Sequence, residues 1–473
     1  MAESYRTVAL LSLVERSTPS KARIVATVAA NPVNTLPAGR LSAVHGVALY
    51  VGAVLGTGVI ALPALAARAA GPASLLAWLG LVLASIPLAA TFAALGARYP
   101  DAGGVSTYAR QAFGPRAAAA VGWWFYAAVP AGAPAAALFA GGYVEAAFGG
   151  GRTTVFATAA GLFVMVGVAN YFGVRVSGLL QLGLAAVLAA VLVVAAVASL
   201  PHARWANMHP FAPHGWLAIG SAAALLVWSF AGWEAVTHLA AEFRHPARDL
   251  PLATGAAIVI VGGLYLAIAA ATILVLGTSA GDSDAPLAEL LARGIGGPAR
   301  SVAALVAVLL TLGVMNTYYA GAAKLGAALG RDGALPAWFA HGSQAGAVPR
   351  RSLAFTVACG GAGLMVAVVT GVDTAPLVLV TTGSFVAVYA LGTAAAIRLL
   401  PRGSGGWWTA VLAFITVLVL VATTGVYLVW PAVVGLAAVL YVRGSRTRRS
   451  RSRGDPSGTP LRQNRTNACP VAE

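Results

Sequence analysis

The sequence predicts an all-α protein that crosses a membrane many times. Of its 473 residues, 59% are hydrophobic and only 9% are charged, whereas soluble domains average about 25% charged residues. Apolar runs of about 20 residues match a hydrocarbon layer about 30 Å thick, because a helix rises about 1.5 Å per residue. We count twelve such runs, centred near residues 57, 85, 130, 162, 188, 229, 263, 310, 361, 386, 416 and 434.

The distribution of basic residues predicts the topology. If the loops alternate from a cytoplasmic N-terminus, 25 of the 30 Lys and Arg residues fall on one side of the membrane. This is the positive-inside asymmetry, so we predict a multi-pass protein of the cell membrane with both termini in the cytoplasm. The same asymmetry accounts for the net charge of +16, and we expect no nucleic-acid partner.

The two ends of the chain are predicted to lie outside the membrane core, which comprises residues 41–442. Residues 1–40 contain one apolar patch of seven residues, too short to span a bilayer, so they are predicted to form a cytoplasmic tail. Residues 443–473 hold arginines among Ser, Gly, Pro and Asn with little to bury. They are predicted to be a basic, disordered cytoplasmic tail that contacts anionic lipid headgroups.

The first apolar run is interrupted at residues 52–63. Three glycines and Pro63 lie where a membrane helix would be most regular. Glycine costs about 1 kcal/mol and proline about 3 kcal/mol in a helix interior, so the sequence predicts a break near Gly56, Thr57 and Gly58. At bilayer depth a break is tolerated only where protein or a water-filled cavity satisfies the freed backbone groups. The break therefore indicates a binding site.

The sixth run carries an acid inside the membrane. Glu234 lies about eighteen residues into this run, and a central acid costs about 3 kcal/mol to insert, so it is a functional candidate or a structurally hydrogen-bonded carboxyl. Glu234, His238 and Glu242 share one helical stripe. This stripe could relay protons, bind a metal or form the polar side of a half-helix. Since the other histidines lie in loops or near helix ends, we expect no metal site and no cofactor.

The two interrupted runs are the first and the sixth, five apart along the chain. Corresponding breaks in two halves are the sequence signature of an inverted repeat with its site at the repeat interface. Because five is odd, the second half has the opposite orientation. The prediction is therefore a core of ten helices in two inverted halves of five, with the last two of the twelve spans outside the repeat.

Four stretches of this chain resemble a known family. They are residues 56–63, residues 99–104 continuing to 112–114, residues 230–234 continuing to 242–251, and residues 330–336. Together they resemble the amino acid/polyamine/organocation (APC) transporters, most closely the bacterial exporters of methionine and branched-chain amino acids. The resemblance covers about residues 41–442 and implies the broken-helix (LeuT-like) transporter fold.

The resemblance implies a secondary active transporter of neutral amino acids across the cytoplasmic membrane, with export by proton antiport. Alternatives are an uptake permease or an exchanger for another amino acid or amine and, more remotely, a metal-ion transporter of the same fold. The expected partners are an amino acid, protons and the lipid bilayer, and the sequence defines no oligomeric state. The 14 acids lie mostly in loops and form no cluster of nucleophile and base, so no catalytic residues and no enzyme are expected.

The resemblance also implies the site residues. In the family, the substrate carboxylate meets N–H groups of the first broken helix, and its ammonium group meets carbonyl groups of the first and sixth helices. Carried over by motif, the substrate-binding residues are Gly56, Thr57, Gly58, Val59, Trp228, Phe230, Ala231, Gly232 and Glu234, and the proton-coupling residues are Glu234, His238 and Glu242. The half-helix that starts at the first break suits a carboxylate, because its unpaired N–H groups carry about half a positive charge.

Two features bear on the substrate and on the coupling ion. The predicted surroundings of the break are apolar, namely Leu55, Val59, Ala131, Ala231 and Val314, so we expect an uncharged substrate side chain. Many proton-coupled members have a lysine in the fifth span, but residues 175–199 contain none, and the eighth span shows Asn316 and Thr317 instead of a clear Ser/Thr pair for sodium. The coupling ion is therefore open, with proton antiport favoured.

Overall fold

The computed structural model describes residues 41–99, 104–173, 178–234, 243–344 and 347–453. Every regular element in these ranges is helical, apart from an isolated bridge between Leu41 and Phe243. The predicted all-α class is thus confirmed. Within the described residues, nine helical stretches are long and apolar enough to cross a membrane, and two of them, Gly58–Arg98 and Gly405–Ser445, each contain parts of two α-helices. The predicted number of twelve spans stays a prediction.

The first half of the chain supplies two short helices and five longer ones. The short ones are α3 and the interhelical α6, and the shortest connection is the single residue Gly114 between α6 and α7. The helices are α3 (Ala43–Val54), α4 (Gly58–Ala70), α5 (Ser74–Arg98), α6 (Val105–Phe113), α7 (Pro115–Phe148), α8 (Gly151–Tyr171) and α9 (Gly178–Ser199).

The second half contains eight helices, of which α12 is a short buried helix between two long ones. They are α10 (Ala218–Phe230), α11 (Pro246–Ala271), α12 (Pro286–Ile295), α13 (Ala299–Arg331), α14 (Arg350–Thr370), α15 (Thr374–Leu399), α16 (Gly405–Thr424) and α17 (Val429–Arg453). Helix α17 continues to Arg453, beyond the predicted core boundary at residue 442.

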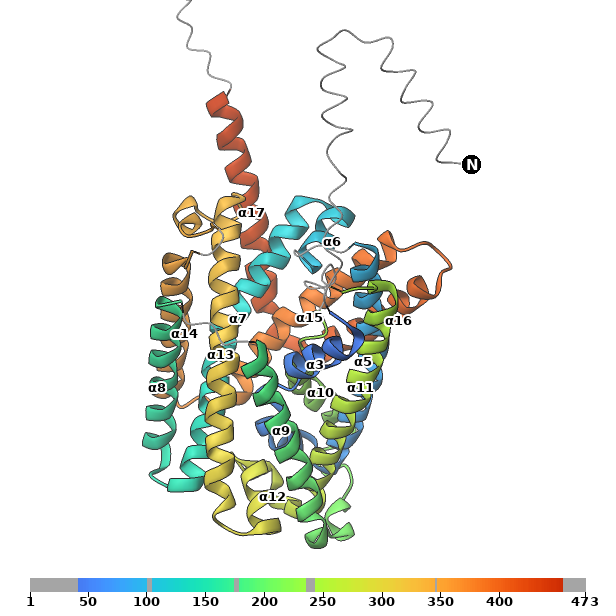
Figure 1. The fold of residues 1–473 in the computed structure, drawn as a ribbon, viewed down its shortest axis with the longest axis vertical. Coiled ribbons are helices and arrows are strands. Elements are labelled where there is room, and N and C mark those ends of the chain that lie inside the picture. Colours follow the sequence, from blue (N-terminus) through green and yellow to red (C-terminus); the bar gives the residue numbers. More distant parts are fainter. Residues whose placement is uncertain (1–40, 100–103, 174–177, 235–242, 345–346, 454–473) are drawn as a thin grey trace, which may run out of the picture.

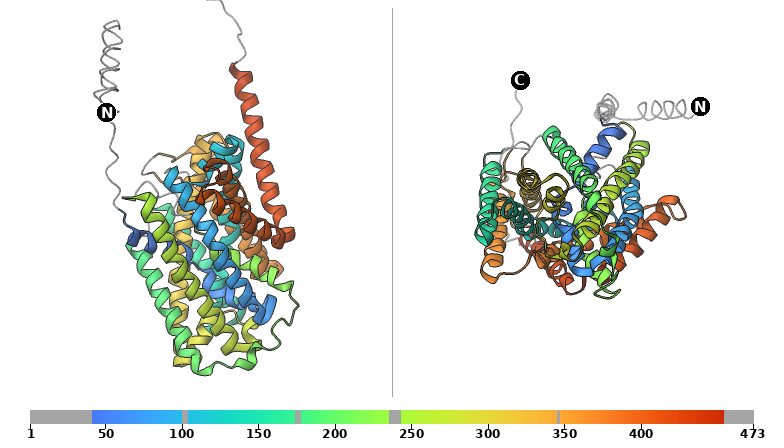
Figure 2. Two further views of the ribbon diagram at one scale, coloured as in Figure 1. Left: turned by 90° about the vertical axis from the view of Figure 1, so that its right-hand side faces the viewer. Right: turned by 90° about the horizontal axis from the view of Figure 1, so that it is seen from below.

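The helices form one elongated bundle (Figure 1), with α12 at one end and α6 near the other. Figure 2 shows the bundle turned by 90°, with most helices along its long axis and α17 at its edge. Helix α4 is the most buried element: eleven of its thirteen residues are buried. A helix that is apolar and buried all round occupies the centre of a fold. The broken first span therefore lies at the core of the bundle, where it contacts α10 and α7.

Candidate functional site

The first break lies between α3 and α4. Helix α3 ends at Val54, α4 begins at Gly58, and Leu55 to Thr57 are not helical. The chain turns tightly here, since the N–H of Gly56 donates to the carbonyl oxygen of Val54 at 2.7 Å. The predicted interruption is therefore present, centred one residue earlier than the Gly56–Gly58 stretch.

The start of α4 offers backbone donors to a ligand. The buried Thr57 occupies the N-cap position, but its side chain makes no capping hydrogen bond. The first N–H groups of a helix have no partner within the helix, and they carry the positive end of its dipole. An uncapped helix start in the core of the bundle is chemically suited to bind a carboxylate.

The second break follows α10. This helix ends at Phe230, Ala231 is extended, and Gly232 has φ of +131°, a conformation that side chains disfavour. Glu234 is the last described residue of this segment. His238 and Glu242, the other two members of the predicted proton-coupling stripe, lie outside the described residues.

The two breaks lie against each other. A Cβ atom placed on Gly232 would lie 3.0 Å from the carbonyl oxygen of Ala53, near the end of α3. The hydroxyl of Tyr265 on α11 lies 2.6 Å from the carbonyl oxygen of Val54 and 3.0 Å from that of Ser229. Since a hydroxyl has one proton, it donates to one of these carbonyls at a time. The Tyr265 side chain thus holds the C-terminal ends of α3 and α10 together.

The converging ends have opposite polarity. The last carbonyls of α3 and α10 carry the negative ends of two helix dipoles, and the first N–H groups of α4 carry a positive end. A zwitterion has a cationic and an anionic group only a few bonds apart. The backbone at the two breaks is therefore complementary to an α-amino acid without a charged side chain beside it.

Glu234 is buried at the second break, with 5% of its surface exposed. Its Oε2 atom accepts hydrogen bonds from the hydroxyl of Tyr389 on α15, at 2.7 Å, and from the N–H of Gly232, at 3.1 Å. The hydroxyls of Tyr50 and Tyr318 lie within electrostatic range of the same carboxylate. A buried carboxylate needs such donors because desolvation alone is costly. The predicted intramembrane acid is therefore hydrogen-bonded to α15 and lies near tyrosines of α3 and α13.

The two predicted aromatic residues of α10 point in different directions. Trp228 packs against Phe139 of α7 with ring centroids 6.3 Å apart, and its ring edge adjoins Gly58 and Gly132. Phe230 instead packs between Trp78 and Tyr265, at 6.1 and 5.4 Å. Trp228 is thus the aromatic residue beside the start of α4, whereas Phe230, at the second break, packs against residues of α5 and α11.

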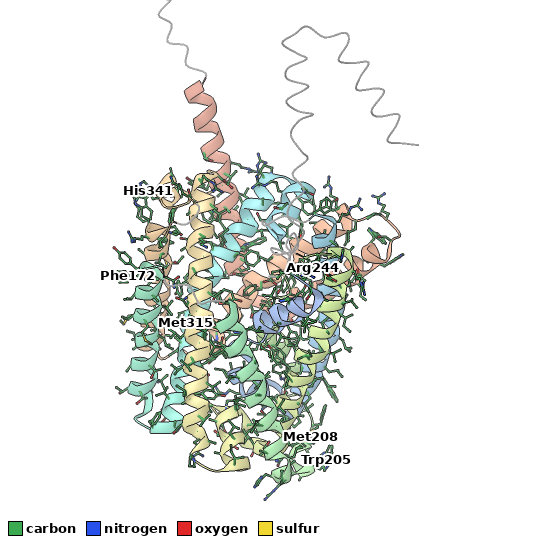
Figure 3. All side chains as sticks on the ribbon, viewed as in Figure 1. Phe172, Trp205, Met208, Arg244, Met315 and His341 are labelled. Atoms are coloured by element: carbon green, nitrogen blue, oxygen red, sulfur yellow. The ribbon has the colours of Figure 1, made fainter. Side chains whose placement is uncertain are left out.

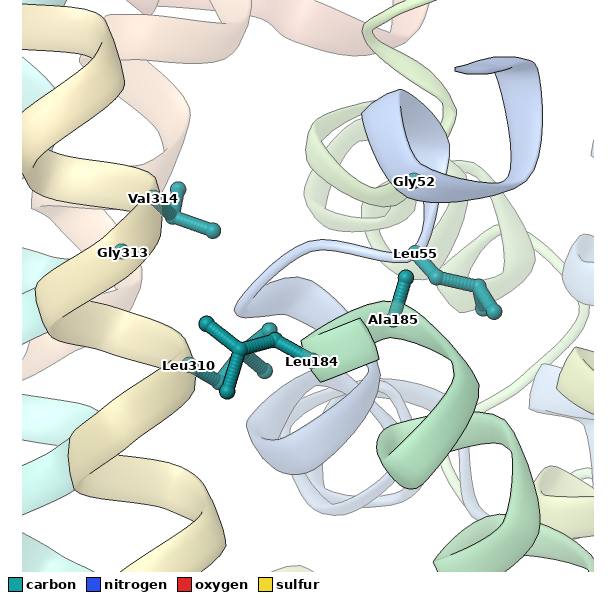
Figure 4. Close-up of a pocket in the computed structure, with 7 residues that line it drawn as sticks. All are labelled: Gly52, Leu55, Leu184, Ala185, Leu310, Gly313 and Val314. Carbon is teal, nitrogen blue, oxygen red and sulfur yellow. The ribbon is translucent and has the colours of Figure 1, made fainter. Parts of the chain in front are cut away.

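A small apolar pocket adjoins the first break (Figure 4). It lies between α3, α9 and α13, and its lining consists of Gly52, Leu55, Leu184, Ala185, Leu310, Gly313 and Val314. Leu55 and Val314 were predicted as apolar surroundings of the site. Val59 is fully buried and does not line the pocket. The junction of the first, fifth and eighth predicted spans therefore presents apolar surface.

Sequence reasoning missed the tyrosines that connect the breaks. Tyr265 and Tyr389 lie within three residues of the predicted span centres at 263 and 386. A hydroxyl at that depth needs a partner inside the protein, and both hydroxyls bond to the breaks. A tyrosine at the centre of an apolar span was therefore a usable signal for residues that face the site.

Two interrupted helices whose oppositely polar ends meet in the core of a membrane bundle define a transporter of small solutes. The chain belongs to the amino acid permease family, whose model matches residues 41–443. It is 33% identical to an uncharacterized amino acid permease of Bacillus subtilis, YecA, over 85% of this chain and 94% of the relative. It is 35% identical to the L-methionine/branched-chain amino acid exporter YjeH of Escherichia coli, over 60% of this chain and 68% of the relative. A branched-chain amino acid permease of B. subtilis, BcaP, is 28% identical over 47% of this chain and 52% of the relative.

Proposed function

We propose that this permease is a secondary active transporter of neutral amino acids with hydrophobic side chains. The observation that carries the proposal is the polarity of the two breaks. Uncapped N–H groups at Gly58 receive the carboxylate, and the carbonyl ends of α3 and α10 receive the ammonium group. The backbone alone supplies both interactions, so the site needs no charged side chain to recognise the α-amino acid part of its substrate.

The proposed selectivity for a substrate with a hydrophobic side chain follows from the residues that line the site. Trp228 covers the start of α4, and the adjoining pocket between α3, α9 and α13 is lined by aliphatic residues and glycine. A charged substrate side chain would lose its hydration there without a partner. The names of YjeH and BcaP, which refer to methionine and branched-chain amino acids, support the same substrate class.

We further propose export by proton antiport, with Glu234 as the titrating group and with His238 and Glu242 as the continuation of its path. The support is the burial of Glu234 beside both breaks and its bond to the Tyr389 hydroxyl. The name of YjeH favours export, and that of BcaP keeps an uptake permease or an exchanger as the alternative. A metal-ion transporter is more remote, because Gly56, Thr57 and Gly58 supply neither a carboxylate nor a thioether.

The test is counterflow of radiolabelled amino acids into proteoliposomes that contain the purified protein. Leucine, isoleucine, valine and methionine should compete with one another. Arginine and glutamate should not compete at tenfold excess. Strong inhibition by arginine would replace this proposal with a carrier for cationic amino acids or amines.

A further inference from the structure

Basic and aromatic side chains gather at one corner of the bundle, where α8 ends and α14 begins. Figure 3 places Phe172 and His341 on the same edge of the molecule, one beyond α8 and the other above α14. The two segments touch, since a Cβ atom on Gly173 would lie 3.0 Å from the side chain of Val348. We call this the α8–α14 corner and define it by Tyr171, Phe172, Trp338, His341, Arg350 and Arg351.

Aromatic rings and polar groups hold both arginines of the corner. The guanidinium carbon of Arg350 lies 4.7 Å from the ring centre of Tyr171, and its Nε donates to the Tyr171 carbonyl oxygen at 3.4 Å. The guanidinium of Arg351 lies 5.6 Å from the Trp338 ring, and its Nη1 donates to Nδ1 of His341 at 3.1 Å. The two cations are therefore oriented by aromatic rings and by hydrogen-bond acceptors that are not carboxylates.

No carboxylate neutralises these cations in the described part of the chain, where the ion pairs are Arg68–Asp373 and Arg331–Asp332. The adjoining residues 174–177 and 345–346, which are not described, include Arg175 and no acid in the sequence. Arg350 and Arg351 are also the first two residues of α14. The helix dipole therefore adds to their positive potential instead of offsetting it.

The corner lies at the boundary of two candidate membrane spans. One span ends at Tyr171 and the other begins at Arg350. Helices α8 and α14 pack side by side (Figure 1), and their outer faces expose aliphatic side chains such as Val168 and Val366. Phe172 and Trp338 are 74% and 50% exposed, as aromatic residues often are at a membrane interface.

We propose that the α8–α14 corner binds the headgroup of an anionic phospholipid. The guanidinium groups of Arg350 and Arg351 contact the phosphate, and the acyl chains lie on the apolar faces of α8 and α14. Guanidinium forks match phosphate geometry, and cations at the membrane surface attract anionic lipids. The adjoining apolar surface selects a lipid over a free phosphate ion.

The test measures lipid retention on the full-length protein by native mass spectrometry. The wild type and the R350Q/R351Q variant are released from micelles that contain equal amounts of phosphatidylglycerol and phosphatidylcholine. The wild type should retain phosphatidylglycerol preferentially. The variant should retain it about 30-fold more weakly, which is the effect expected from removing two interfacial cations.

The matched control is R98Q/R398Q, which removes two other exposed arginines, each beside an aromatic ring at the end of a helix. It should change phosphatidylglycerol retention less than twofold. Equal losses in both variants would show a general charge effect and overturn the proposal. So would displacement of the lipid by 10 mM inorganic phosphate. If R350Q/R351Q does not yield a monodisperse protein, R350Q alone should reduce retention about fivefold, and no reduction in it would overturn the site.

Discussion

The two helix breaks are built in different ways. At the first break, a Cβ atom on Gly56 would lie 3.9 Å from the Val54 carbonyl oxygen, its nearest neighbour among the described residues, so these residues leave room beside the backbone. At the second break, Gly232 is pressed against Ala53, and Glu234 and Tyr389 fix the chain through hydrogen bonds. At the first break, the backbone thus has room beside it for a ligand, whereas the second break is stabilised by contacts with neighbouring residues.

This difference assigns separate roles to the two breaks. The first has free volume and uncapped donors, which suits recognition of a ligand by the backbone. The second has a glycine in a conformation that other residues disfavour and a buried acid, which suits a structural support that can also titrate. Substitutions at Gly56, where the first break has room, should therefore change substrate affinity, and substitutions at the second break should change stability or pH coupling.

The largest effect is expected at Gly232. The change Gly232→Ala places a side chain at φ of +131°, which costs about 1–3 kcal/mol, and brings it within 3.0 Å of the Ala53 carbonyl oxygen. We expect a lower melting temperature in detergent and no counterflow. The control Gly263→Ala in α11, where a Cβ meets no atom of the described residues within 4 Å, should keep the wild-type melting temperature and counterflow. A fully active Gly232→Ala protein would show that the two breaks are not in close contact.

The second-largest effect is expected at Gly58, and the prediction compares it with Gly56, the other glycine of the first break. A Cβ atom on Gly58 would overlap with Ser229 Oγ and lie 2.9 Å from Trp228 Cδ1. The change Gly58→Ala should therefore cost about 1–3 kcal/mol of stability through overpacking, along with most transport. Gly56→Ala has room and should melt like the wild type, yet bind substrate about tenfold more weakly, because the methyl group occupies ligand space. Unchanged affinity in Gly56→Ala would move the carboxylate site away from this turn.

A smaller effect is expected from Tyr265→Phe, which removes the hydroxyl shared by the ends of α3 and α10. Loss of one buried hydrogen bond costs about 1–1.5 kcal/mol. Counterflow at low substrate concentration should fall about fivefold to tenfold, since the two carbonyl ends lose their common donor. The control Tyr441→Phe alters a ring on α17 that packs on Trp123 and should leave counterflow unchanged. Equal activity in both variants would remove Tyr265 from the site.

The sequence was sufficient for the fold class and for the location of both breaks. Glycine and proline at bilayer depth and one intramembrane acid are local signals, so Gly56, Gly58 and Glu234 could be found without coordinates. The connections between helices could not be found in this way. Which ring of α10 faces α4, and which hydroxyls reach the breaks, depend on helix rotation, and an apolar span with little amphipathicity does not define its own rotation.

The smallest effect on counterflow is expected from Glu234→Gln. This change also distinguishes most sharply between the roles of the two breaks, substrate recognition and pH coupling. The hydrogen bonds that Glu234 accepts from Gly232 and Tyr389 both reach one atom, Oε2, so a glutamine oxygen can accept these two while the titratable group is lost. Counterflow requires no net proton movement and should stay within about twofold of the wild type. Flux driven by an imposed pH gradient requires a carried proton and should lose its acceleration. Gradient-driven flux equal to that of the wild type would leave Glu234 as a hydrogen-bonded support of the second break and would move the proton path elsewhere.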